Sequence, residues 1–305
     1  MKIILSRKGF DSQYGKIKSP IMPDGTLLSL PIPQENDTKT FDELYYNDKA
    51  SYIEIIKELK PNWQYPANNK SRTIPTKDKQ TVHLDPDLRK ETLKDRPDDW
   101  KAIFGQSAAA QGHLSNQGVG IGDIFLFFGT FGETKYENGK LVYNTKSDYL
   151  DGAHVIFGYL QIGEIIKLND PQDYDELQND PLRNYAKNHP HAYKEYRDQN
   201  DRERINNCMY IASEKLTSLN LDLPGAGTLD YNNKKRVLSK KGLNKSQWDY
   251  PFTEFRNLKI SYHSEKAFQE GYFQSAAKGQ EFVIDTNNKF QKELMTWVKD
   301  LIKND

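Results

Sequence analysis

The chain has 305 residues and one cysteine, Cys208, which excludes an intramolecular disulfide and a zinc cluster of thiolates. Its 43 basic and 43 acidic side chains give no net charge, which argues against non-specific binding to duplex DNA. No apolar run reaches the roughly 18 residues of a membrane helix, and the first residues lack a signal-peptide run, so we expect a cytoplasmic protein without a membrane partner.

The first predicted element is a buried strand at residues 3–5, and a turn rich in cations follows it directly. Gly9 follows Arg7 and Lys8, and a glycine turn beside cations can bind an anion through its backbone N–H groups. We therefore name Arg7, Lys8 and Asp11 as candidate ligand-binding residues. In the alternative interpretation the turn is solvated and Asp11 pairs with Arg7. The spacing is not that of a phosphate-binding P-loop.

Residues 40–60 have nearly helical apolar spacing, and a polar loop separates them from a predicted strand at 81–84. His83 and Asp85 are two positions apart, so on extended backbone their side chains point to the same side. The pair is half of a two-histidine, one-carboxylate iron site, which needs a distal histidine, and it also suits a carboxylate that orients a catalytic imidazole. In the alternative, residues 85–87 cap a following helix, a role that we favour for Asp87. His83 and Asp85 are candidate catalytic residues, and candidate ligands if the unidentified cofactor is a divalent metal.

Residues 104–114, FGQSAAAQGHL, combine small residues with two glutamines and a histidine. Small residues let a ligand approach closely, and an amide such as that of Gln106 can both donate and accept at the edge of a base. We name Gln106 as a ligand-binding candidate and His113 as a catalytic candidate that completes a site with His83. The alternative is a short alanine-rich helix packed in the interior. The following GVGIGD, at 118–123, opens a strand and is therefore not a dinucleotide-binding loop.

The strongest strand signal spans residues 122–167. The apolar run 124–128 predicts a strand covered on both faces, and Asn138-Gly139 predicts a hairpin turn. Gly158 and Gly163 interrupt a long strand at 154–166 and predict bulges or bends that curl a sheet. We therefore predict an α+β fold, with a mixed, strongly curled sheet or partial barrel, a β-rich core at roughly 118–167 and peripheral helices.

The second half of the chain carries further candidates between weaker elements. A helix is predicted within 180–204, strands at 209–212 and 280–285, and an amphipathic helix at 289–303, in a single domain spanning 1–305. His189 and His191 either bind a metal or a phosphate or lie in a flexible surface loop. QWDYPF, at 247–252, is either a stacking platform for a base or a satellite core. Further ligand-binding candidates are His154, His191, Gln280 and Glu281.

Short segments that together span almost the whole chain resemble, in the same order, those of a known family. They are SRKGFDS (6–12), SPIMPDG (19–25), PIP (31–33), HLDPDL (83–88), FGQSAAAQGHL (104–114), GVGIGDIFLFFGTF (118–131), HVIFGYLQIGE (154–164), HPH (189–191), GAG (225–227) and GQEFVID (279–285). With these segments the chain resembles the third of the nucleotide-modification-associated domain families. It departs from that pattern at TFGE (130–133), where an aromatic residue followed by Arg is expected.

The resemblance implies nucleotide or nucleic-acid base chemistry in bacteria or their phages, with a nucleotide or base as the partner. Three functions stay open. The favoured one is an enzyme that modifies a nucleotide or a base. The second is a non-catalytic reader, because 122–128 and 154–166 look like the curled barrel of PUA/EVE-like domains, which would hold a flipped base. The third is an oxygenase dependent on iron and 2-oxoglutarate, built from His83, Asp85 and a distal histidine.

Overall fold

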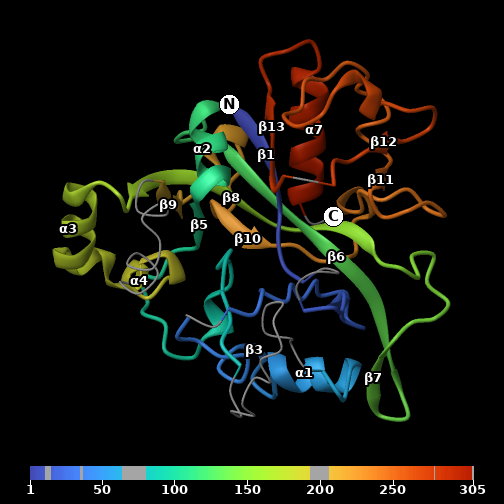
Figure 1. Ribbon diagram of the computed structural model, residues 1–305, viewed down its shortest axis with the longest axis horizontal. Coiled ribbons are helices and arrows are strands. Elements are labelled where there is room, and N and C mark those ends of the chain that lie inside the picture. The colour runs from blue at the N-terminus through green and yellow to red at the C-terminus, as the bar shows by residue number, and fades with distance from the viewer. Residues whose placement is uncertain (11–14, 35–36, 64–79, 193–205, 278, 304–305) are drawn as a thin grey trace.

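A mixed β-sheet forms the centre of the computed structural model in Figure 1, which describes residues 1–10, 15–34, 37–63, 80–192, 206–277 and 279–303. Within these residues nine strands join the sheet along the path β13-β1-β6-β8-β9-β5, with β10 beside β8 and with β2 and β7 beside β6. β1 is parallel to β6 and antiparallel to β13, which confirms a mixed sheet. The strands are β1 (Lys2–Arg7), β2 (Ser19–Ile21), β5 (Ile103–Ser107), β6 (Ile124–Glu137), β7 (Lys140–Tyr143), β8 (Ala153–Lys167), β9 (Asn207–Ala212), β10 (Ala226–Thr228) and β13 (Glu281–Asp285).

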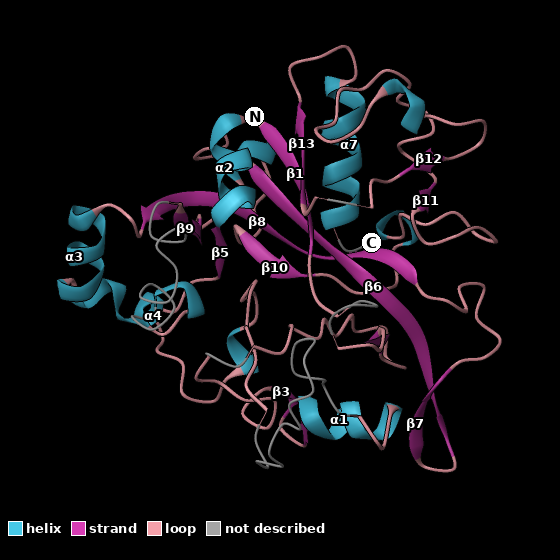
Figure 2. Cartoon of the chain, in the orientation of Figure 1, coloured by secondary structure: helices cyan, strands magenta, loops and turns pink. Residues whose placement is uncertain are grey.

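The helices lie around the sheet, as Figure 2 shows, and none described is long and apolar enough to span a membrane. They are α1 (Tyr52–Leu59), α2 (Ala108–Asn116), α3 (Pro171–Asn179), α4 (Asn184–Lys187) and α7 (Gln291–Ile302). Two small two-stranded sheets pair β3 (Tyr45–Asn47) with β4 (Ala50–Ser51) and β11 (Gln247–Trp248) with β12 (Phe273–Gln274). Short 3-10 turns are η1 (Lys90–Thr92), η2 (Pro181–Arg183), η3 (Pro190–Ala192), η4 (Thr217–Leu219), η5 (Lys234–Arg236) and η6 (Glu265–Ala267). The α+β class and the C-terminal helix are thus confirmed.

Apolar side chains cover both faces of the sheet, as the run at 124–128 predicted. Ile124 and Leu126 join a core cluster that includes α7, whereas Phe125 and Phe127 join a second cluster with Phe104. Alternate residues of a strand point to opposite faces, so a strand that is buried on both sides is apolar throughout. Cys208 also belongs to this interior, and its burial raises the pKa of the thiol to about 11.

The predicted bulges are present, but the predicted barrel is not. The pairing register shifts at Phe127–Phe128, opposite Gly158, and again between Ile162 and Glu164, around Gly163. These irregularities bend single strands without closing the sheet, because β13 and β5 remain its two separate ends. The strongly curled sheet is therefore not confirmed.

Three other predicted elements differ from the structure. The helix expected over 40–60 forms only as α1, whose first turn is fixed by a capping box between Ser51 and Glu54, and a hairpin precedes it. The strand expected at 81–84 makes only isolated bridges. The helix expected within 180–204 forms only η2, α4 and η3, and its remainder, 193–205, lies outside the described residues. Trp248 and Phe252 are fully buried whereas Tyr250 is exposed, so the Trp248 and Phe252 rings belong to the core and do not form the stacking platform.

Two smaller clusters hold the loops that reach the end of the sheet at β5. One packs α1 against Phe10, Phe41 and Val82, beneath the segments around residues 37 and 83. The other packs Leu177 and Tyr185, from the α3–α4 region, against β9 and β5. These clusters hold in place loops that lie beyond the main sheet. They bring three segments that are distant in the sequence together near β5.

Candidate metal centre

The edge strand β5 organises the site. Asp87 bridges Ile103 through backbone hydrogen bonds, and two residues further along, the Gly105 N–H donates to Asp85 Oδ1 over 2.7 Å. His191, from η3, packs directly on Gly105, where a Cβ atom would lie only 2.2 Å from the imidazole ring. A side chain at position 105 would therefore displace His191, and glycine is required for this close approach.

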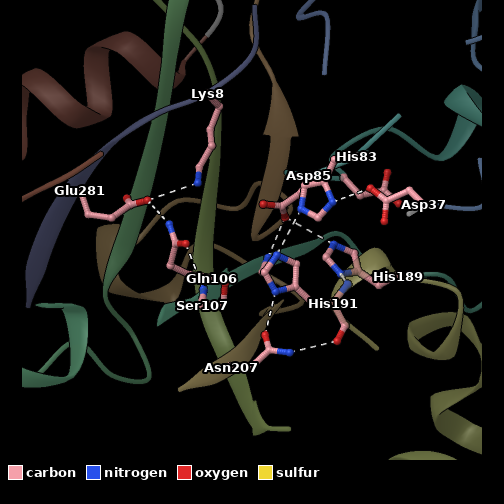
Figure 3. A network of polar contacts seen from close by, with 12 residues as sticks. Lys8, Asp37, His83, Asp85, Gln106, Ser107, His189, His191, Asn207 and Glu281 are labelled. Carbon is pink, nitrogen blue, oxygen red and sulfur yellow. Dashed lines mark hydrogen bonds and ion pairs between the residues drawn. The ribbon is translucent and has the colours of Figure 1, made fainter. Parts of the chain in front are cut away.

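His83, Asp85 and His191 form one cluster of metal-ligating side chains in the part of the chain that the structure describes. The Nε2 atoms of His83 and His191 face each other at 3.3 Å, and one ligand atom from each of the three residues lies within 4.8 Å of the others. Figure 3 shows the two rings and the carboxylate converging. An ion about 2.05 Å from both nitrogen atoms would make an N–metal–N angle of roughly 107°, close to tetrahedral.

The other ring nitrogen of each histidine is held by a hydrogen bond that fixes its orientation. Asp37 Oδ2 accepts from His83 Nδ1 at 2.7 Å. Asn207 Oδ1 accepts from His191 Nδ1 at 2.7 Å, while its amide nitrogen donates to the His191 carbonyl, which settles which way the amide points. Both Nδ1 atoms therefore carry hydrogen, and both Nε2 atoms are directed to a shared point, as in metal sites whose histidines are oriented by outer partners.

The charges of the site differ from residue to residue. Burial opposes a positive charge on His83, but the hydrogen bond and charge of Asp37 outweigh it and raise the pKa of His83. Burial lowers the pKa of His191 to about 3. Burial alone would raise the pKa of Asp85, yet the contact with His189 and the charge of Lys8 hold it well below its ordinary value. These shifts favour a positive charge on His83 beside a neutral His191 and an ionised Asp85.

A second polar group lies next to these three residues. Lys8 Nζ is 3.2 Å from Glu281 Oε1, and Gln106 Nε2 donates to the same oxygen over 2.6 Å. The Lys8 ammonium also lies over the ring of Phe104, 4.2 Å from its centroid. Figure 3 shows Lys8 descending between Glu281 and Asp85, and its charge influences the pKa of both His83 and Asp85. Lys8, Gln106 and Glu281, which are three of the predicted ligand-binding residues, therefore lie beside the metal-ligating cluster.

The remaining candidates lie elsewhere. His113 contacts Ser261 Oγ and the ring of Tyr262, not His83. His154 is buried and its Nδ1 accepts a hydrogen bond from Trp248. Arg7 donates to the carbonyl groups of residues 276 and 277, Gln280 is exposed, and Asp11 lies outside the described residues.

Sequence reasoning missed Asp37, Asn207 and the burial of His189. Asp37 lies in a segment without a recognisable motif, and Asn207 only begins a strand. His189, expected more readily on the surface, is 3% exposed, and its Nε2 lies 3.4 Å from Asp85 Oδ1. No local pattern marks these residues, because their role comes from contacts across the fold.

Comparison with known proteins fits this assembly of segments. The model of a family described as nucleotide modification associated domain 3 matches residues 2–285, a range that includes every residue of the site and excludes α7. Comparisons with curated proteins and with solved structures give no match. The family match confirms the resemblance seen in the sequence. The chain belongs to the nucleotide modification associated domain 3 family.

Proposed function

We propose that this protein is a metal-dependent enzyme that acts on a nucleotide or a nucleic-acid base. His83, Asp85 and His191 would hold one divalent ion. The observation that carries the proposal is the convergence of two Nε2 atoms at 3.3 Å, with both Nδ1 atoms already engaged by Asp37 and Asn207. The family's association with nucleotide modification supports the choice of substrate.

A purely structural role explains this arrangement less well. Two imidazoles, a carboxylate and an ammonium group lose hydration when they are buried, and apolar side chains of similar size would pack there at lower cost in free energy. The outer hydrogen bonds leave the Nε2 atoms directed at one another, a geometry that a cation between them would use fully.

The donor set suits either zinc or ferrous iron, because two histidines and one carboxylate leave coordination positions open. A bound ion would supply Lewis acidity or would activate water or dioxygen. The chain's own residues supply the surroundings: Lys8 can hold an anionic group, and Glu281 Oε2, which is buried without a hydrogen-bond partner, can accept from an N–H group of a substrate. These roles extend the ligand-binding prediction for both residues.

Metal analysis of the purified protein tests the proposal. We expect about one equivalent of zinc or iron per chain, and at least a tenfold loss of affinity in His83→Ala and in His191→Ala. His113→Ala is the matched control, since it removes an imidazole outside the triad and should keep the metal. Stoichiometric iron together with consumption of 2-oxoglutarate would identify the oxygenase. The metal centre would be refuted by a wild-type protein that takes up no metal. It would also be refuted by normal metal binding in a variant that combines His83→Ala with His191→Ala.

The rival function is a reader that binds a modified nucleotide without converting it. A reader predicts saturable binding and unchanged nucleotide after incubation with metal-loaded protein, whereas an enzyme predicts a new mass that disappears in His83→Ala. Mass spectrometry of the incubated nucleotides separates the two outcomes.

A further inference from the structure

A hollow of about 300 Å³ lies beside the metal centre and shares residues with its surroundings. Asp87 and His189 line it, and both are buried. His189 Nε2 is 3.4 Å from Asp85 Oδ1, so this side chain contacts both the hollow and a proposed metal ligand. The hollow therefore adjoins the site without containing its ligands.

Aromatic rings and charged side chains of both signs line the hollow. Tyr45, Trp100 and Tyr185 contribute rings, and Arg96 lies over the Trp100 ring at 4.3 Å while it pairs with Asp87. Aromatic surfaces with a guanidinium beside them suit a flat, conjugated ligand that stacks. A volume near the lower end of small-ligand pockets, about 300–1,000 Å³, suits one nucleoside and not a segment of duplex.

One buried nitrogen atom of the lining, Nε of Arg96, lacks a hydrogen-bond partner. His189 Nδ1 accepts from the His191 N–H, so its hydrogen belongs on Nε2, which faces the Asp85 carboxylate. A buried donor left unpaired costs free energy, and a ligand with a ring-nitrogen or carbonyl acceptor would satisfy Arg96 Nε. Nucleobases combine such acceptors with a stacking surface.

We infer that this hollow binds a single nucleoside, with its base against the aromatic rings and an acceptor atom toward Arg96. The inference rests on the proposed function and assigns it a substrate pocket. The nucleoside belongs either to a free nucleotide or to a base unstacked from a single strand, which present the same chemistry.

Trp100 provides a signal for binding, because it lines the hollow whereas Trp63, Trp248 and Trp297 are buried in core clusters. Metal-depleted protein is titrated with the four deoxynucleoside monophosphates and with single-stranded oligonucleotides of each base. We expect a saturable change of tryptophan fluorescence that Trp100→Phe abolishes. Binding of a monophosphate indicates a free nucleotide as the source, and binding of an oligonucleotide alone indicates a base within a strand.

Filling the hollow provides the second measurement, read by calorimetry. Leu93→Trp, and Lys94→Trp at the exposed rim as a variant with less risk to folding, should each weaken nucleoside binding at least tenfold and leave metal content unchanged. Ile121→Trp is the control, since Ile121 is exposed and does not line the hollow. If no nucleotide or oligonucleotide binds, or if neither filled variant weakens binding, the inference is overturned while a metal-loaded protein still upholds the metal centre. Nucleoside binding by a chain that never takes up metal would overturn only the metal centre.

Discussion

At the residue scale, the partner of each imidazole decides its charge. Asp37 stabilises a positive His83, whereas the neutral amide of Asn207 leaves the burial of His191 uncompensated. The pKa values of the two histidines consequently shift in opposite directions although their Nε2 atoms are in contact. A metal ion would take the place of the proton between them, because both Nε2 atoms would then act as ligands.

His154 shows what burial does to an imidazole without a carboxylate partner. Burial lowers the pKa of His154 well below its ordinary value, and its Nδ1 accepts from Trp248. The unfolded chain binds a proton near pH 6.5 and the folded chain does not, so stability falls as the pH drops below about 6.5, by up to about 1.4 kcal/mol per pH unit. His154→Asn keeps an acceptor for Trp248 and cannot titrate. We expect its melting temperature to fall less between pH 7 and pH 5 than that of the wild type, and equal slopes would contradict this.

At the element scale, β5 acts as a platform with three functions in successive residues. Phe104 supports the Lys8 ammonium, Gly105 holds Asp85 and gives room to His191, and Gln106 fixes Glu281. Successive residues of a strand point to opposite sides, so Phe104 and Gln106 point to one side of β5, and His191 packs on Gly105 from the other side. A single edge strand therefore joins the cluster of His83, Asp85 and His191 to the second polar group.

Gly105→Ala tests this platform. The added Cβ would lie 2.2 Å from the His191 ring, so the ring must move, and we expect a loss of about 1–3 kcal/mol in stability and a loss of metal binding. Gly120→Ala is the matched control, because a Cβ there meets nothing within 4 Å. Denaturant unfolding and metal titration of both variants measure the effect. Normal metal affinity in Gly105→Ala would show that His191 is not held as described.

At the scale of the whole molecule, α7 packs on one face of the sheet in the cluster of Ile124 and Leu126, and the other face forms the cluster of Phe125, Phe127 and Phe104. Arg236, fully buried, holds the end of α7. Its Nε donates to the Leu301 carbonyl over 2.7 Å, its Nη2 donates to the Lys303 carbonyl, and its Nη1 donates to Asp230. The last carbonyl groups of a helix have no partner within it, so Arg236 supplies their donors.

Arg236→Met keeps most of the volume and removes these donors. We expect unfolding to become easier by about 2–4 kcal/mol, because buried carbonyl groups and Asp230 lose their partner. Lys235→Met removes the neighbouring, exposed ion pair with Asp300 and should cost less than about 1 kcal/mol. Denaturant unfolding compares the two. Metal content of folded Arg236→Met should be normal, and similar stabilities of the two variants would refute the role of Arg236.

The sequence by itself determined features that local patterns encode. The apolar run at 124–128, the Asn138-Gly139 turn, the bulges at Gly158 and Gly163 and the last amphipathic helix all follow from periodicity and backbone freedom over a few residues. His83 and Asp85 were paired for the same reason, since extended backbone directs residues two apart to one side.

Only the tertiary structure decided which distant residues join that pair. His191 is 108 positions from His83 in the sequence. It joins His83 in place of the predicted His113 because the cluster around Tyr185 and Met209 packs η3 onto Gly105. Packing between distant segments also places Asp37 and Asn207 against the two histidines, and no sequence motif marks either residue. Alternation along a strand tells which face a side chain takes, but not which strand or loop will lie against that face. Packing between segments far apart in the chain settles that choice.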